Sequence, residues 1–302
     1  MKNAARMGRI AAITFVLLLA CIIAFAQGGG FGGGGGGGGR RNLGGGGRGS
    51  STPANEWTLK AGFEQDAITF VRIWVNGSGR GGGWGGGSDF PGAENNLSYR
   101  LQQLTSMQMN PHPERMELTD PRLLQYPFIF MNDPRALRLS DEEVKNLRKY
   151  LLNGGFLMID DFWGPYMLDN FKREMAKVLP GKRPESLPLD HELFQFIYKF
   201  QAKPQIPSDD SAWNMKDDPD PARRTWEYDF RNMTPQPADF IAYFDDKGRM
   251  IVLICHNNDL SDGWEREDGW ADPEAGYWFF TTYSQPLGYP MAINIFFYAL
   301  TH

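Results

Sequence analysis

Two acidic residues stand directly after an apolar run in the middle of the chain. The run Phe156–Ile159 predicts a short buried strand, and Asp160 and Asp161 follow it. Neighbouring residues of a strand point to opposite faces, so both carboxylates face one ligand only where the strand has ended. Two close carboxylates can hold a divalent cation, and we predict Asp160 and Asp161 as metal ligands or as an acid–base pair. The alternative is structural, with one aspartate capping the next helix and the other bonding backbone in the turn.

A second polar group follows another apolar run, Met250–Cys255, which also predicts a strand. Ligands of open α/β sheets bind outside the carboxyl ends of the strands, so polar residues at these ends are binding candidates. The predicted ligand-binding edge comprises Asp89, Asp160, Asp161, His256, Asn258 and Asp259.

Aromatic side chains accompany these polar groups, since the chain is 14% aromatic. Four tryptophans fall in predicted loops: Trp84, Trp163, Trp264 and Trp270. Carboxylates and amides beside aromatic faces suit a sugar ligand. The alternative is that the tryptophans cover the edge of the sheet, since buried area accounts for most aromatic residues.

No complete catalytic or cofactor motif accompanies these residues. A zinc-binding helix needs a second histidine four residues after His191, where the chain has Gln195. The G-x-S-x-G turn of a serine hydrolase is missing, and Cys255 is predicted to be a buried, inert thiol. Gly77–Gly82 matches G-x-G-x-x-G, but no helix opens at its third glycine, which favours a mobile loop. We therefore predict no cofactor, with a divalent cation as the one exception.

The elements that must position these residues alternate between strand and helix through the first half of the domain. This pattern predicts an α/β fold with a parallel, doubly wound sheet. The expected strands are Ala67–Val75, Met116–Leu118, Tyr126–Met131 and Phe156–Ile159. The expected helices are Ala93–Met107, Ser140–Asn153 and Tyr166–Leu179. Ser140 and Glu143 fit a capping box at the start of the second helix, and Gly154 and Gly155 stop it.

The second half of the chain is less regular. His191–Phe200 is expected to be a helix, and the Pro- and Asp-rich segment Lys203–Pro221 to be an exposed insertion. Phe240–Phe244 and Met250–Cys255 predict a β-hairpin, since Asp245–Gly248 between them suits a tight turn. Met291–Leu300 is apolar nearly all round and predicts a buried closing helix.

The N-terminal segment predicts export. Basic residues precede the apolar run Ile10–Ala26, and Ala24–Ala26 offers an A-x-A cleavage site, so residues 1–26 read as a signal peptide. The alternatives are an uncleaved anchor in the inner membrane and a lipid-modified Cys21. Residues 27–52 predict a disordered glycine-rich linker, and residues 53–302 one α/β domain. The net charge of −5 gives no basic footprint for nucleic acid.

An ordered set of short motifs resembles a known family. These motifs are Asp89–Gly92, Asn95–Leu97, Leu118–Pro121, Tyr126–Phe128, Gly154–Leu157 with Asp160–Asp161, His191–Phe194, and Asn258–Leu260 near Trp264. The set is similar to the bacterial domain-of-unknown-function family 4159 (DUF4159). The resemblance implies a flavodoxin-like fold of the class I glutamine amidotransferase-like superfamily, and relatives that are exported.

The resemblance carries no activity. In amidotransferases a nucleophilic cysteine follows the strand that corresponds to Phe156–Ile159, and this chain has Asp160 and Asp161 there. We therefore predict a periplasmic or secreted, non-catalytic domain that binds an envelope protein or glycan. The alternative is a hydrolase of an envelope glycan or peptide that works through the acidic strand-end site.

Overall fold

The computed structural model describes residues 55–62, 64–74, 90–227, 234–265 and 272–302, all in the part of the chain after residue 46. The predicted signal peptide, the predicted linker and Asp89 lie outside the described residues. So do Gly77–Gly82, Trp84 and Trp270. Of the helices that the structure describes, none is long and apolar enough to cross a membrane.

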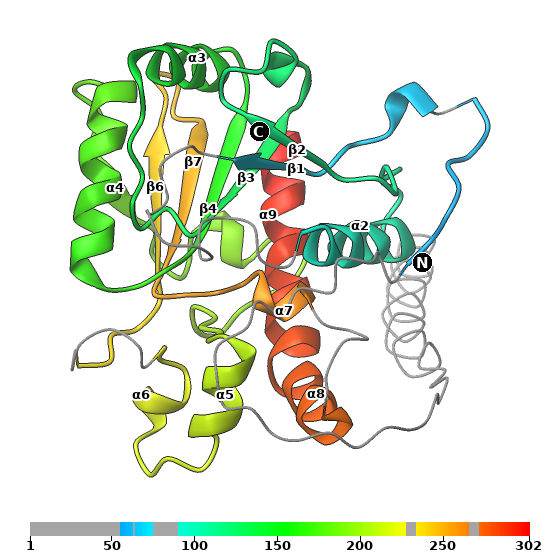
Figure 1. Ribbon diagram of the computed structural model, residues 1–302, viewed down its shortest axis with the longest axis vertical. Coiled ribbons are helices and arrows are strands. Elements are labelled where there is room, and N and C mark those ends of the chain that lie inside the picture. The colour runs from blue at the N-terminus through cyan, green and yellow to red at the C-terminus, as the bar shows by residue number, and fades with distance from the viewer. Residues whose placement is uncertain (1–54, 63, 75–89, 228–233, 266–271) are drawn as a thin grey trace, which may run out of the picture. The chain divides into compact units, whose positions relative to one another are not determined.

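Seven strands form one sheet in the order β2-β1-β3-β4-β7-β6-β5. Their bounds are β1 Val71–Trp74, β2 Glu114–Glu117, β3 Phe128–Asn132, β4 Phe156–Phe162, β5 Glu185–Ser186, β6 Asp239–Phe244 and β7 Met250–His256. The first five strands in this order, β2, β1, β3, β4 and β7, run parallel to one another. Strand β6 joins antiparallel to β7, and β5 joins antiparallel to β6. With β7 as the fifth parallel strand, the order is the flavodoxin-like 2-1-3-4-5. The predicted fold class, with its hairpin of β6 and β7, is confirmed (Figure 1).

Helices cover both faces of the sheet (Figure 1). The α-helices are α2 Gly92–Leu104, α3 Asp141–Leu152, α4 Gly164–Val178, α5 Asp209–Met215, α6 Pro221–Arg224, α7 Asp262–Glu265, α8 Pro273–Phe279 and α9 Tyr289–Thr301. A π-helical segment, η4 Phe280–Gly288, joins α8 to α9. Helices α3 and α4 pack on one face, in a core with Ile159 and Ile254, and α2 and α9 pack on the other, with Phe128 and Phe130. The predicted closing helix is therefore confirmed as α9, and it is buried.

Local signals explain why α3 and β4 form where they do. The Ser140 hydroxyl accepts a hydrogen bond from the Glu143 backbone N–H (3.3 Å), and the Glu143 carboxylate accepts one from Ser140 N–H (2.7 Å). This is the predicted capping box. At the other end Gly154 takes a φ of 109°, a conformation that costs glycine little, and turns the chain into β4.

The predicted helix over His191–Phe200 is wrong, because only the 3₁₀ turn η3, Glu192–Phe194, forms there. The reason is Asn294, which is fully buried in α9. Its side-chain oxygen accepts hydrogen bonds from the N–H groups of Ile197 and Tyr198, and its amide donates to the Leu193 and Tyr198 carbonyls. One side chain thus satisfies four backbone groups of this segment, and these groups need no helical hydrogen bonds.

The expected exposed insertion Lys203–Pro221 is only partly exposed. Ile206 and Ala212 are fully buried, and α5 begins at Asp209 within the segment. Asn258 holds the start of the segment against the end of β7. Its side chain accepts from Ile206 N–H (2.9 Å) and donates to the Pro204 carbonyl (2.8 Å).

The cap of α3 yields a stability prediction. Replacing Ser140 with alanine removes the acceptor for Glu143 N–H, and we expect the free energy of unfolding to fall by about 1 kcal/mol. Ser140→Asp keeps an acceptor at the same position and is expected to retain nearly all of the stability. Urea unfolding of the three proteins measures both effects, and an equal loss in the two variants would contradict the capping role.

Candidate functional site

Three neighbouring strands end in the same unusual backbone conformation. Asp133 after β3, Asp161 in β4 and Asn257 after β7 have φ values of 48°, 55° and 55°. Residues other than glycine rarely adopt this left-handed region, although Asp and Asn tolerate it best. Such strained residues concentrate at functional sites. The shared conformation therefore marks the carboxyl edge of β3, β4 and β7 as a candidate site.

Backbone hydrogen bonds join these three turns. Asp133 N–H donates to the Asp160 carbonyl (3.1 Å), Asp161 N–H donates to the Asn258 carbonyl (3.1 Å), and Asn257 N–H donates to the Phe162 carbonyl (3.0 Å). Each strained residue is thus held by the neighbouring strand end. These hydrogen bonds fix the backbone of this edge and, with it, the directions in which its side chains leave the chain.

Strand β4 runs three residues beyond its predicted end, through Asp160 and Asp161 to Phe162. Asp160 pairs in register with Asn132 of β3, and the pairing with β7 is irregular between Ile159 and Phe162. This irregularity and the positive φ of Asp161 separate the two aspartates. Asp160 is fully buried and accepts a hydrogen bond from Ser261 N–H (2.8 Å), whereas Asp161 is partly exposed.

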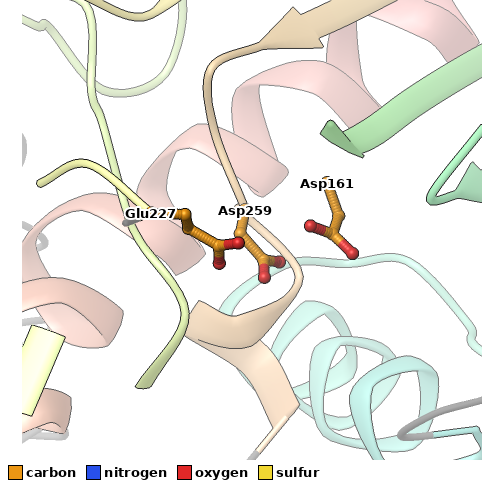
Figure 2. Close-up of side chains that lie close together, drawn as sticks. All are labelled: Asp161, Glu227 and Asp259. Carbon is orange, nitrogen blue, oxygen red and sulfur yellow. The ribbon is translucent and has the colours of Figure 1, made fainter. Parts of the chain in front are cut away.

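Asp161 meets two other carboxylates at this edge. One oxygen each of Asp161, Glu227 and Asp259 lie within 4.8 Å of one another. Figure 2 shows the three side chains converging from three separate segments: β4, the chain after α6, and the chain after β7. We name these residues the carboxylate triad. It contains two predicted site residues, Asp161 and Asp259, and one that the sequence did not indicate, Glu227.

Position in the chain explains why Glu227 was not predicted. It follows Trp226 in the irregular second half, with no strand end or motif beside it. A hydrogen bond from Ser208 N–H to its carboxylate (2.9 Å) places it at the site. Ser208 in turn follows Ile206, whose carbonyl accepts from Asp259 N–H (2.8 Å). No local sequence signal reports a position that depends on such distant contacts.

The electrostatic environment disfavours ionised carboxylates. Burial, then the charges of Glu227 and Asp133, raises the pKa of Asp161 well above its ordinary value. Burial, then the charges of Asp262 and Asp161, does the same to the pKa of Asp259. Burial also raises the pKa of Glu227.

A second layer of acids borders the carboxylate triad. Burial raises the pKa of Asp160 to about 7 and also raises that of Asp133. Arg135 is the cation beside this group, 2.5 Å from Asp133. Two buried oxygens, Asp160 Oδ1 and Asp133 Oδ2, have no hydrogen-bond partner among the described residues. Buried polar atoms are normally satisfied, so this edge offers oxygen ligands for a cation.

The geometry suits a hard divalent cation. Calcium takes oxygen ligands at about 2.3–2.6 Å, so two ligands on opposite sides of the ion are about 5 Å apart. The carboxylate triad falls inside that limit. Magnesium binds at about 2.0–2.1 Å and requires a tighter arrangement. The predicted metal ligand Asp161 therefore has its partners in Glu227 and Asp259, and Asp160 lies outside the three-oxygen group.

The other predicted site residues have structural partners. His256 Nε2 lies 2.9 Å from the Gly164 carbonyl oxygen, and its ring packs against Phe162. Asn258 is fully buried and makes the Pro204 and Ile206 contacts described above. Trp163 and Trp264 are each only 1% exposed, which fits the packing alternative for both rings. Cys255 is buried, and burial raises the pKa of its thiol, as expected of an inert cysteine.

Comparison with known proteins identifies the family. The family described as "Domain of unknown function (DUF4159)" matches residues 70–300. The chain belongs to the DUF4159 family. No curated protein matches the chain. The DUF4159 match extends from the residue before β1 to the last turn of α9, so it contains the carboxylate triad. The likeness to glutamine amidotransferases stays a prediction, and function has to be argued from the site.

The raised carboxyl pKa values predict a pH dependence of stability. A raised pKa means that the folded state binds protons more tightly, so stability falls as pH rises from the ordinary carboxyl value of about 4 towards the folded value. For Asp160 that upper limit is about 7. In EDTA we expect a higher melting temperature at about pH 5.5 than at about pH 7.5. Burial lowers the pKa values of His191 and His256, which acts in the opposite sense, but these are two imidazoles against several carboxylates.

A matched variant isolates this effect. Asp161→Asn removes one repelling charge and keeps a residue that tolerates the left-handed backbone. We expect it to raise the melting temperature at about pH 7.5 and to flatten the pH dependence. An unchanged pH profile in thermal unfolding would show that Asp161 does not carry the excess charge.

Proposed function

We propose that this DUF4159 domain is a divalent-cation-binding module of the cell envelope. The carboxylate triad carries the proposal, because three carboxylate oxygens lie within 4.8 Å of one another at the edge where α/β sheets bind ligands. A cation at this position would neutralise the like charges that raise the three pKa values. It would also bind carboxylate oxygens that lie partly buried among other acidic groups.

The donor set narrows the choice of cation. The triad consists of carboxylates alone, and such hard oxygen ligands suit calcium, magnesium or manganese. Zinc prefers histidine or cysteine ligands. His256 is engaged with Gly164, and Cys255 is buried within β7. Calcium is the ion we propose, because oxygens within 4.8 Å of one another fit the span of about 5 Å that its bonds allow.

The location and the partner extend the proposal. The predicted signal peptide supports export to the periplasm or beyond, where calcium is abundant enough to occupy moderate-affinity sites of extracellular modules. Three protein oxygens leave coordination positions for a partner, since calcium takes six to eight ligands. A carboxylate or hydroxyl oxygen of an envelope protein or glycan would complete the shell. The domain would then act as a scaffold that is tethered by its glycine-rich linker.

The second candidate is a cation-dependent hydrolase. One observation favours it: burial raises the pKa of Asp160 to about 7, which is suited to a general base near neutral pH. Two observations count against it. Ser261, the hydroxyl beside the carboxylate triad, is fully buried and donates to Asp259 (2.9 Å), and Cys255 is buried away from solvent. The binding role is therefore preferred.

Terbium luminescence tests the cation site. Terbium replaces calcium at oxygen sites and is excited by nearby tryptophan. Trp163 lies two residues after Asp161, and Trp226 directly precedes Glu227. The centroids of the two tryptophan rings are 5.3 Å apart. We expect saturable luminescence that calcium displaces, and a melting temperature that rises with calcium by mass action. At 100 times the dissociation constant, the added stability is about 2.7 kcal/mol.

Variants decide whether the triad is the site. Asp259→Asn is expected to weaken terbium and calcium binding at least about tenfold, equivalent to about 1.4 kcal/mol. Asp246→Asn changes an aspartate that is 95% exposed at the far hairpin and should bind like the wild type. Equal binding by all three proteins would refute the site. Calcium-dependent turnover of an envelope glycan or peptide, lost in Asp160→Asn, would establish the hydrolase instead.

A further inference from the structure

A cavity lies beside the end of β7, between the start of α4 and the chain that leads into β6. Its volume is about 870 Å³. Typical small-molecule pockets have volumes of about 300–1,000 Å³. Pro165 and Leu168 of α4 line one wall, and Lys203 and Asp239 line another. His256 and Asn257 form the part that β7 contributes, so we name it the β7 pocket.

Two amide side chains hold the walls of the β7 pocket in place. Asn257 accepts a hydrogen bond from Gly164 N–H (2.8 Å) and donates to the Pro237 carbonyl (3.1 Å). Gln205 donates to the carbonyls of Gln236 (2.8 Å) and Asn257 (3.0 Å). Four chain segments are thus joined around the cavity. A pocket whose frame is fixed by such contacts needs little reorganisation to bind a ligand.

His256 brings a ring nitrogen acceptor to the edge of this pocket. The residue lines the cavity and is 6% exposed. Because Nε2 lies 2.9 Å from the Gly164 carbonyl oxygen, Nε2 carries the hydrogen and Nδ1 is the acceptor. Nδ1 has no hydrogen-bond partner among the residues that the structure describes. Burial lowers the pKa of His256, so the ring is neutral and this acceptor persists at neutral pH.

The charges at the β7 pocket balance. Lys203 Nζ donates to Asp239 Oδ1 (2.7 Å), and Ser186 Oγ donates to the same oxygen (2.5 Å). The second carboxylate oxygen of Asp239 stays available as an acceptor. A neutral ligand fits this balance better than an ion does, since an ion would have to displace the Lys203–Asp239 pair.

We propose that the β7 pocket binds a neutral saccharide unit. Sugar hydroxyls both donate and accept, so they can donate to His256 Nδ1 and to Asp239 while accepting from Lys203. The C–H face of the sugar ring would pack on Pro165 and Leu168, which form the apolar wall. The inference does not rest on the carboxylate triad, because none of the three triad residues lines this cavity.

Saturation-transfer NMR of the full chain tests the proposal, with cellobiose and N,N′-diacetylchitobiose as probes. The buffer contains EDTA, so a failure of the cation proposal leaves this test intact. We expect at least one of the two disaccharides to give transfer signals. Inorganic phosphate and a neutral tripeptide serve as competitors, and neither should displace the sugar. No sugar signal at millimolar probe, or displacement by phosphate or the tripeptide, would overturn the inference.

Two variants locate the binding. His256→Phe keeps a ring against Phe162 but removes the acceptor, and we expect at least about tenfold weaker binding, as for the loss of one buried hydrogen bond. Ala202→Trp fills the pocket from an exposed position without touching the core, and should abolish binding even if His256→Phe folds poorly. His112→Phe, at an exposed histidine elsewhere, should bind normally. Undiminished sugar binding by Ala202→Trp would place the ligand elsewhere and overturn the assignment.

Discussion

The hydrogen bonds of Asn258 are the constraint on which the carboxyl edge of the sheet depends. Its carbonyl holds Asp161 of β4, and its side chain holds the backbone at Pro204 and Ile206. The segment after Ile206 then positions Glu227 through Ser208. One buried amide thus joins the parallel sheet to the irregular second half. An unsatisfied buried amide costs free energy, so these contacts tolerate little displacement. The positions of the carboxylate triad are therefore closely fixed as well.

Whereas the hydrogen bonds of Asn258 stabilise this edge, the electrostatics of its carboxylates disfavour it. Carboxylates at the ends of β3, β4 and β7 are partly or fully buried, with Arg135 as the neighbouring cation. Burial alone favours their protonated forms, and their mutual repulsion adds to the effect. Elsewhere in the domain a buried charge has a direct partner, as Arg72 of β1 has in Glu94 of α2. The edge thus holds buried carboxylates that contribute little to stability when they are ionised, in line with the proposed cation site.

How much the sequence predicts depends on the range of the interactions involved. The capping box of Ser140 and the turn at Gly154 are local, and α3 forms and β4 begins where these signals place them. The hairpin of β6 and β7 likewise follows from its turn residues. The segment His191–Phe200 has helical composition, but Asn294, about a hundred residues later, satisfies its backbone. Glu227 is beyond prediction for the same reason. Asp161 and Asp259 were predictable because strand ends are local features.

The left-handed residues at the strand ends set a limit on how this domain can be stabilised. Glycine adopts that backbone region without strain, so replacing Asp133, Asp161 or Asn257 with glycine relieves the steric strain of the folded backbone. The same replacement deletes a carboxylate of the proposed cation site at Asp161, a bordering carboxylate at Asp133, or the amide that frames the β7 pocket at Asn257. Thermostability and ligand recognition therefore compete at the same three positions. Selection for heat resistance alone would be expected to enrich glycine there. The resulting domain would be more thermostable but would lose binding of the proposed ligands.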